Sequence, residues 1–273
     1  MDINAYLERI GVPATSPAPS LAALRQLHRQ HVLSVPFESL SIHSGEKILL
    51  DPALLYEKIV ERRRGGFCCE NNGLFLWVLR VLGYKPRILS ARVQNKTTGA
   101  YGPPYDHMVL TVELEGRRWL CDVGFGEGIR TPFPLESGWE EEQDGCRLRL
   151  RVEKDEWFLE KKEGDGWRSL YKFTLQERRF EEFQGMCDYH QTSPSSLFFC
   201  KSLCSLQLPR GRVTYLGRRL ITTHIQADGS AVKTTRELTD EEIPAVLRDT
   251  FGVVLSGKLV PKDDDILPPP LSA

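Results

Sequence analysis

The sequence lacks an excess of either charge. Its 36 lysines and arginines nearly balance its 37 aspartates and glutamates, which leaves a formal net charge of −1 at pH 7. A chain without a net field has no general attraction for nucleic acid or for an anionic membrane surface. We therefore expect its partners to be small molecules bound at local sites, with no nucleic acid and no membrane among them.

Targeting segments and long apolar runs are also missing. Residues 1–19 contain Asp2, Glu8 and Arg9 among scattered apolar residues, so they lack the basic-then-apolar pattern of a secretory signal. The longest apolar run, 73–82, is interrupted by Arg80 and is too short to span a bilayer. We expect a cytoplasmic protein whose 273 residues form one large domain or a few smaller ones.

The seven cysteines lack the paired spacing of a zinc site and the density of a disulfide-rich secreted domain. We therefore expect reduced thiols and no metal. Cys200 and Cys204 lie in the apolar segment SLFFCKSLCSL, which is typical of buried core cysteines.

The hydrophobic pattern changes twice along the chain, which predicts an α+β fold. The first third favours helices, one capped by Ser20, a second from Asp51-Pro52 to the pair Gly65-Gly66, and a buried third over 69–82. Short runs separated by turns predict antiparallel strands from Lys85 to about Leu175. Further strands follow, then a late helix with a Thr239–Glu242 capping box, and the tail 263–273 is predicted to be extended or poorly ordered.

The segment RRRGGFCCENN places two cysteines at the start of the buried helix. A cysteine in a first helical turn meets unsatisfied backbone N–H groups and the positive end of the helix dipole, and both favour a thiolate. Successive helical residues point about 100° apart, so only one of Cys68 and Cys69 can face a cleft. Cys68 is the better placed, being closer to the glycine pair. The alternative, two small core cysteines at a tight helix corner, stays open at this point.

The segment HMVLTVELEGRRWLCDVGF predicts a β-hairpin with the two-residue loop Glu115-Gly116. In that register Val109 pairs with Asp122, so His107 and Asp122 become diagonal neighbours on one face. A carboxylate within reach of an imidazole could be a plain surface pair, but the cysteine upstream favours a catalytic group. The opposite face is predicted to be core, and it carries Met108, Leu110, Val112, Leu114, Trp119, Cys121 and Val123.

The glycines at 124–128 do not follow the spacing GxGxxG, and the next residues, IRTPFPL, cannot continue as the required helix. We therefore exclude a dinucleotide-binding fold and expect a glycine-rich cleft edge.

Six segments together resemble a known family, the arylamine N-acetyltransferases. They occur in the same order over nearly the whole chain: VPFESL at 35–40, RGGFCCENN at 64–72, HMVL at 107–110, DVGFG at 122–126, YHQTSP at 189–194 and KLVPK at 258–262. The resemblance implies a helical domain at 1–84, an antiparallel β-barrel at 85–195 and an α/β domain at 196–273. It also implies a Cys-His-Asp triad arranged as in thiol proteases.

Functionally, the resemblance selects Cys68 as the nucleophile, with His107 and Asp122 completing the triad. It implies acetyl-CoA as the acyl donor and aromatic amines, hydrazines or arylhydroxylamines as acceptors, in a ping-pong reaction through an acetyl-cysteine. By position, coenzyme contacts are predicted at Pro103, Pro104, Tyr189 and Ser195, and acceptor contacts at Asp106, His107 and Phe125.

The chain departs from the family pattern in two places. The loop GPPYD lacks the Ser/Thr-Gly of many vertebrate members, and GDGWRSLYKFTL is shorter than their equivalent stretch. Two other functions are compatible with these residues: a thiol hydrolase or transglutaminase-like enzyme with the same triad, and a non-catalytic protein that retains the fold.

Overall fold

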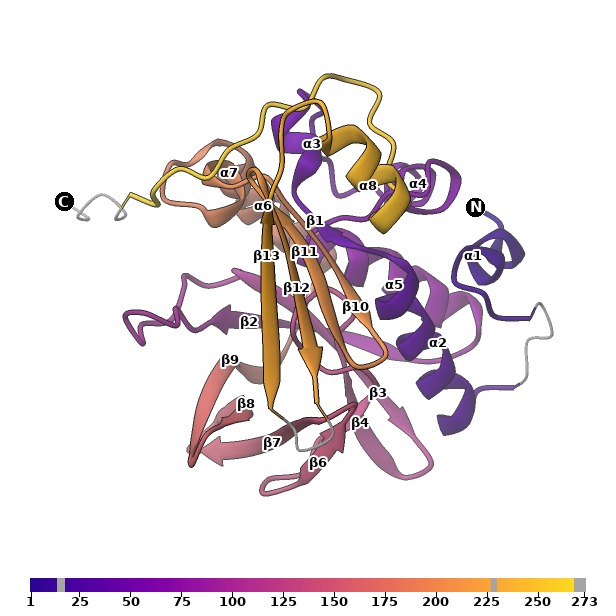
Figure 1. The fold of residues 1–273 in the computed structure, drawn as a ribbon. Coiled ribbons are helices and arrows are strands. Elements are labelled where there is room, and N and C mark those ends of the chain that lie inside the picture. Colours follow the sequence, from indigo (N-terminus) through magenta and orange to yellow (C-terminus); the bar gives the residue numbers. More distant parts are fainter. Residues whose placement is uncertain (14–17, 227–229, 268–273) are drawn as a thin grey trace.

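The computed structural model describes residues 1–13, 18–226 and 230–267 (Figure 1). It is an α+β structure, as predicted, in which a helical first region packs on a curled antiparallel sheet and on a second sheet near the C-terminus. Residues 14–17, 227–229 and 268–273 lie outside the described residues, and the prediction for the proline-rich tail falls largely on the last of these segments.

The first region contains the predicted helices. They are α1 (Ile3–Arg9), α2 (Leu21–Ser34), α3 (Leu40–His43), α4 (Pro52–Tyr56), the π-helical segment η1 (Glu57–Glu61) and α5 (Cys68–Val81). The Ser20 hydroxyl accepts from the Ala23 N–H, and the Asp51 carboxylate caps α4. Both N-caps were expected from the sequence.

One helix prediction was wrong in its extent. The segment expected to run from Pro52 to the glycine pair leaves α-helical geometry after Tyr56 and ends at Glu61. The helix ends early because of a residue that follows it. The buried Arg64 guanidinium points inward to the Glu38 carboxylate, with its Nε 2.9 Å from Oε1. A helix continuing to Gly65 would keep the chain from making this pair.

The curled sheet contains eight strands in the order β5-β4-β3-β2-β9-β8-β7-β6. Their bounds are β2 (Pro86–Val93), β3 (His107–Leu114), β4 (Arg117–Cys121), β5 (Phe133–Pro134), β6 (Glu140–Gln143), β7 (Cys146–Glu153), β8 (Glu156–Glu163) and β9 (Gly166–Arg178). Gln143 on the last strand bonds the backbone of Arg130 and Thr131 beside the first strand, so the sheet curls into the predicted barrel-like form.

The β3–β4 hairpin has the predicted register, with Leu114 opposite Arg117 and Leu110 opposite Cys121. Both turn residues, Glu115 and Gly116, have positive φ, as a type I′ hairpin turn requires. The predicted core face joins the helical region in one hydrophobic cluster with α5. The other face carries Val109 and Leu120 into a second core inside the barrel.

The third region is a five-stranded antiparallel sheet in the order β1-β10-β11-β12-β13. It is formed by β1 (Phe37–Glu38), β10 (Leu203–Leu208), β11 (Gly211–Leu216), β12 (Arg219–Ile225) and β13 (Ala231–Glu237), and it has its own core with α8 (Ile243–Phe251). Since β1 comes from the VPFESL segment, the sheet ties the first region to the last. The orange strands and yellow α8 show this arrangement in Figure 1.

Along the chain, three short helices separate β9 from β10. They are η2 (Phe180–Phe183), α6 (Gln184–Thr192) and α7 (Leu197–Cys200). Phe183 and Cys187 pack into the core of the helical region. The domain boundaries 84/85 and 195/196 stay predictions. Thr239 and Glu242 exchange the predicted capping bonds, but the regular helix begins at Ile243, three residues after the start at Asp240 that a Thr239 cap predicts.

Candidate active site

Cys68 is the first residue of α5, one residue before the predicted start at Cys69, and the cysteine pair lies in the first helical turn as predicted. The helix begins there because the Glu70 carboxylate accepts from the Phe67 N–H at 3.1 Å and satisfies one donor of the first turn. Cys68 lies where the helical region meets the curled sheet, and it is only 3% exposed. All seven cysteines are free, and Cys200 and Cys204 are buried, as expected.

Two glycines let other segments approach the helix start. A Cβ on Gly65 would lie 1.9 Å from the carbonyl oxygen of Pro36, so the VPFESL segment crosses directly over it. A Cβ on Gly124 would lie 2.8 Å from the Cα of Cys68. The loop after β4 therefore rests on the backbone of Cys68, which brings Asp122 and Phe125 to the helix start.

His107 begins β3 and faces Asp122, which follows β4. The His107 Nε2 and Asp122 Oδ2 atoms are 2.8 Å apart, and each residue is 1% exposed. The proximity predicted from the hairpin register is thus confirmed. His107 is also close enough to Cys68 to influence the acidity of its thiol.

The thiol pKa values of Cys68 and Cys69 are shifted in opposite directions. The pKa of Cys68 lies well below its ordinary value, chiefly because of the hydrogen bond with Cys69, whose Sγ is 3.8 Å away. Burial opposes this shift, and a hydrogen bond and positive charge from His107 reinforce it. The same contact with Cys68, together with burial, raises the pKa of Cys69 well above the ordinary range. Cys68 is therefore the thiolate of the pair.

The imidazole and carboxylate stabilise each other as an ion pair. Burial by itself would lower the pKa of His107, but the charge and hydrogen bond of Asp122 and the neighbouring Cys68 raise it to about 10. Burial would likewise raise the pKa of Asp122, yet His107, Asn72 and the Gly124 N–H lower it. These shifts favour a thiolate at Cys68, an imidazolium at His107 and a carboxylate at Asp122.

Asn72 is a functional neighbour that sequence reasoning missed. Its Nδ2 donates to Asp122 Oδ1 at 2.9 Å and to the Met108 carbonyl at 2.7 Å, while its Oδ1 accepts from the Val123 N–H at 2.9 Å. It lies four residues after Cys68, on the same face of α5. That spacing was a usable signal within the ENN motif.

Aromatic rings cover the imidazole. Phe125, predicted at the acceptor site, has its ring centroid 5.2 Å from that of His107. Tyr171 of β9, which sequence reasoning missed, lies 5.0 Å from His107 and 5.4 Å from Phe125. These rings limit the contact of the imidazole with water.

Asp106 lies beside the nucleophile through its backbone. Its carbonyl oxygen is 3.7 Å from the Cys68 Sγ, whereas its carboxylate accepts from the Val93 N–H at 3.1 Å. Burial raises the pKa of this carboxyl. The preceding residues, Pro103 and Pro104, are exposed at the tip of the loop.

Tyr189 of α6 and Ser195, which precedes α7, are half-buried. His190, next to Tyr189, has its Nδ1 2.9 Å from Ser196 Oγ and its Nε2 3.9 Å from Asp106 Oδ1. Through His190 and Asp106, α6 therefore meets the loop before β3, and each of these two segments carries predicted coenzyme residues.

Residues 1–13, 18–226 and 230–267 contain no group of three or more His, Cys, Asp or Glu side chains that could hold a metal ion. Within the same described ranges, no helix is long and apolar enough to cross a membrane.

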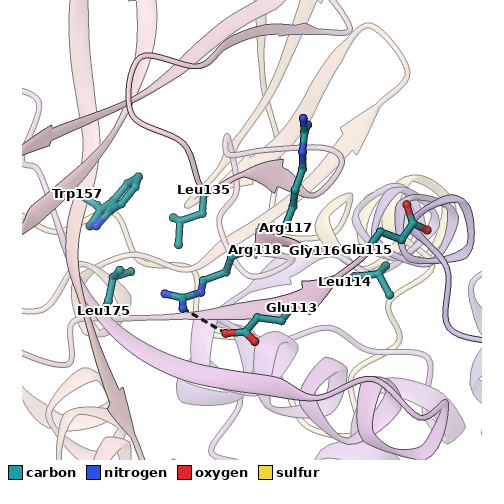
Figure 2. Close-up of a pocket in the computed structure, with 9 residues that line it drawn as sticks. All are labelled: Glu113, Leu114, Glu115, Gly116, Arg117, Arg118, Leu135, Trp157 and Leu175. Atoms are coloured by element: carbon teal, nitrogen blue, oxygen red, sulfur yellow. Dashed lines mark hydrogen bonds and ion pairs between the residues drawn. The ribbon is translucent and has the colours of Figure 1, made fainter.

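A separate groove lies at the turn end of the β3–β4 hairpin, far along the strands from His107, and is lined by Leu135, Trp157 and Leu175 (Figure 2).

Comparison with known proteins places these features in one family. The N-acetyltransferase family model matches residues 20–260. The chain is 35% identical to arylamine N-acetyltransferase 2 of Mus musculus over 97% of this chain and 98% of that protein. The structure of the arylamine N-acetyltransferase from Mycobacterium abscessus has a TM-score of 0.85 and 30% identity, covering 94% of this chain and 91% of that one. The enzyme of Mycobacterium marinum in complex with CoA has a TM-score of 0.81 and 31% identity, with 92% and 93% covered.

Proposed function

The chain belongs to the arylamine N-acetyltransferase family of acyltransferases, and on that basis we propose that it moves acetyl from acetyl-CoA to an arylamine through an acetylated Cys68. The observation that carries the proposal is that Cys68, with a lowered pKa, begins α5 beside a His107 whose Nε2 is 2.8 Å from Asp122 Oδ2.

In the first half-reaction the Cys68 thiolate attacks the thioester carbonyl carbon of acetyl-CoA. A tetrahedral oxyanion forms, and it then collapses as the carbon–sulfur bond to CoA breaks. The His107 imidazolium gives its proton to the departing CoA sulfur, so the products are acetyl-Cys68, neutral His107 and CoA. Asp122 holds the imidazole orientation and stabilises its charged form before this transfer.

In the second half-reaction the amine nitrogen attacks the acetyl carbonyl carbon. Neutral His107 takes a proton from the nitrogen, the bond to Cys68 breaks, and the thiolate–imidazolium pair returns with the acetylated amine as product. Hydrazines and arylhydroxylamines present a comparable nucleophile, and we propose them as further acceptors.

The binding residues follow the same proposal. CoA would lie along Pro103, Pro104, Tyr189 and Ser195, and the acceptor would meet Asp106, His107 and Phe125. The complex of the Mycobacterium marinum relative with CoA supports CoA as cosubstrate. The aromatic surface of Phe125 beside His107 supports a flat aromatic acceptor.

Rapid mixing with acetyl-CoA in the absence of amine tests the covalent step. We expect a burst of about one CoA per active site, with the acetyl group on the peptide that contains Cys68. Adding an arylamine should then start steady turnover with parallel double-reciprocal plots. Rapid, continuous CoA release before any amine is added would identify a thioester hydrolase instead. No burst and no alkylation of Cys68 would identify a non-catalytic protein.

A further inference from the structure

His28 of α2 is a fully buried histidine that contacts the backbone of Asp122, the residue proposed to supply the triad carboxylate. Its Nε2 is 3.0 Å from the Asp122 backbone nitrogen, and its Nδ1 is 3.0 Å from the carbonyl oxygen of Arg130. One imidazole therefore spans the two ends of the loop 122–130, which carries Gly124 and Phe125.

The two contacts fix the chemical state of the ring. A backbone N–H can only donate, so Nε2 must be the unprotonated acceptor, and a carbonyl oxygen can only accept, so Nδ1 must carry the proton. Burial is the largest influence on the ring and lowers the pKa of His28 to about 4, although the hydrogen bond to the Arg130 carbonyl and the negative charge of Asp122 oppose this. His28 is thus neutral and in a single tautomer at pH 7.

The far end of the loop is anchored as well. The Arg130 guanidinium donates to the carbonyls of Leu208 and Gly211 at the β10–β11 turn, with Nη2 2.7 Å from the Gly211 oxygen. It also lies 3.3 Å from Asp144, which pairs with Arg29, the residue after His28. The loop is therefore held at both ends by His28 of α2, and its Arg130 end is also held by the third region.

We propose that His28 is a positioning residue for acetyl transfer: by accepting from the Asp122 N–H and donating to the Arg130 carbonyl, it holds the loop so that the Asp122 carboxylate faces His107. Asn72 holds the carboxylate itself, while His28 holds the backbone that carries it. This inference rests on the proposed function, because it assigns a role through Asp122.

Three variants test the inference. His28→Leu removes both hydrogen bonds and leaves the Asp122 N–H buried without a partner. His28→Gln keeps one acceptor and one donor on a neutral side chain. His31→Leu is the matched control, because His31 is an equally buried histidine one turn along α2 that bonds Tyr6 and makes no contact with Asp122.

We expect His28→Leu to lower kcat/KM, per folded molecule, by about 10- to 100-fold, because small misplacements of a catalytic group cost that much. The pH at which iodoacetamide alkylation of Cys68 is half-maximal should rise, since a displaced Asp122 supports the imidazolium less well. His28→Gln should restore most of both properties, and His31→Leu should leave both unchanged. If His28→Leu lowers activity only in proportion to its unfolded fraction, with an unchanged alkylation profile, the inference is overturned.

A measurement on the unmodified protein keeps the inference testable if His28→Leu does not fold. Nitrogen-15 correlation spectra at pH 7 should show one histidine, lost in His28→Gln, with a protonated Nδ1 and a bare Nε2. The opposite tautomer or a charged ring would overturn the inference. Failure of the proposed function would look different, since the unmodified enzyme would then show no acetyl burst whatever the state of His28.

Discussion

The β3–β4 hairpin carries a pair of opposite charges at each end, on the same face, and the two pairs differ in almost every property. At the open end, His107 and Asp122 are 2.8 Å apart with side chains 2% and 0% exposed. Near the turn, Glu113 and Arg118 are 3.2 Å apart with side chains 54% and 36% exposed (Figure 2). The third partner of the buried pair is the Cys68 thiol, whereas Glu113 at the exposed end also pairs with the exposed Arg87 guanidinium at 3.7 Å.

The difference shows that pairing of opposite charges has a large effect on pKa and stability only where the pair is buried. An exposed pair contributes about 0.2–1 kcal/mol and is screened by salt. Removing one partner of a buried pair lowers the free energy of unfolding by about 3–5 kcal/mol, because the other charge is left uncompensated. The charge of Asp122, acting on an imidazole that the aromatic rings and α5 bury, therefore raises the pKa of His107, whereas the charges beside the Figure 2 groove stay solvated.

The largest expected effect comes from removing the third partner at the buried end. Cys68→Ser should abolish turnover and alkylation, because a serine hydroxyl has no thiolate to present at neutral pH. Steady-state acetylation assays and iodoacetamide labelling measure this. Cys69→Ser is the matched control and should keep substantial activity, and equal losses in both variants would contradict the assignment of Cys68.

The next effect comes from neutralising the buried carboxylate. Asp122→Asn should lower kcat by about 10⁴-fold, since an amide does not stabilise the imidazolium and can select the wrong tautomer. Single-turnover acetylation by acetyl-CoA isolates the step. Near-normal acetylation in this variant would show that the buried pair is no more important than the exposed one.

The contribution of the buried His107–Asp122 pair to protein stability should depend on pH. The raised pKa of His107 means that its contribution is complete below its ordinary value of 6.5 and is lost as pH rises through about 10. The lowered pKa of Asp122 means that its contribution is complete above its ordinary value of 3.8 and is lost as pH falls below it. Thermal melts should thus show a wild-type advantage over Asp122→Asn that fades at both limits. An advantage that persists unchanged above pH 10 would argue against the ion pair.

The smallest effect is expected at the exposed end. Glu113→Gln or Arg118→Gln should change the free energy of unfolding by less than about 1 kcal/mol, and added salt should remove the difference. Acetylation rates should stay near those of the wild type. Urea titrations at low and high salt measure the first effect, and a large loss of activity in either variant would mean that the two ends are coupled.

The sequence was sufficient for features set by local rules. The type I′ turn at Glu115-Gly116 dictates the register, which in turn predicted that His107 and Asp122 meet. The N-caps Ser20 and Asp51 and the cysteine at the start of α5 follow from similarly local patterns. The catalytic roles themselves stay predictions until the variants are measured.

Contacts between distant segments could not be predicted. His28 meets Asp122 across 94 residues, and nothing in the pattern of α2 separates it from His31, which is equally buried. The early end of η1 depends on Arg64 finding Glu38, 26 residues away. Such polar partners are selected by tertiary packing, which periodicity does not record.

The two-residue turn at Glu115-Gly116 also controls chemistry that occurs at the opposite end of the strands. Because side chains alternate between faces, one inserted residue in the turn would move every later residue of β4 out of phase and send Asp122 toward the helical core instead of His107. Two inserted residues would keep the phase but shift Asp122 along the strand. The length of this turn, which touches no substrate in the proposed reaction, is thus as strictly constrained as the identity of the nucleophile, and natural insertions are expected in other loops of the barrel.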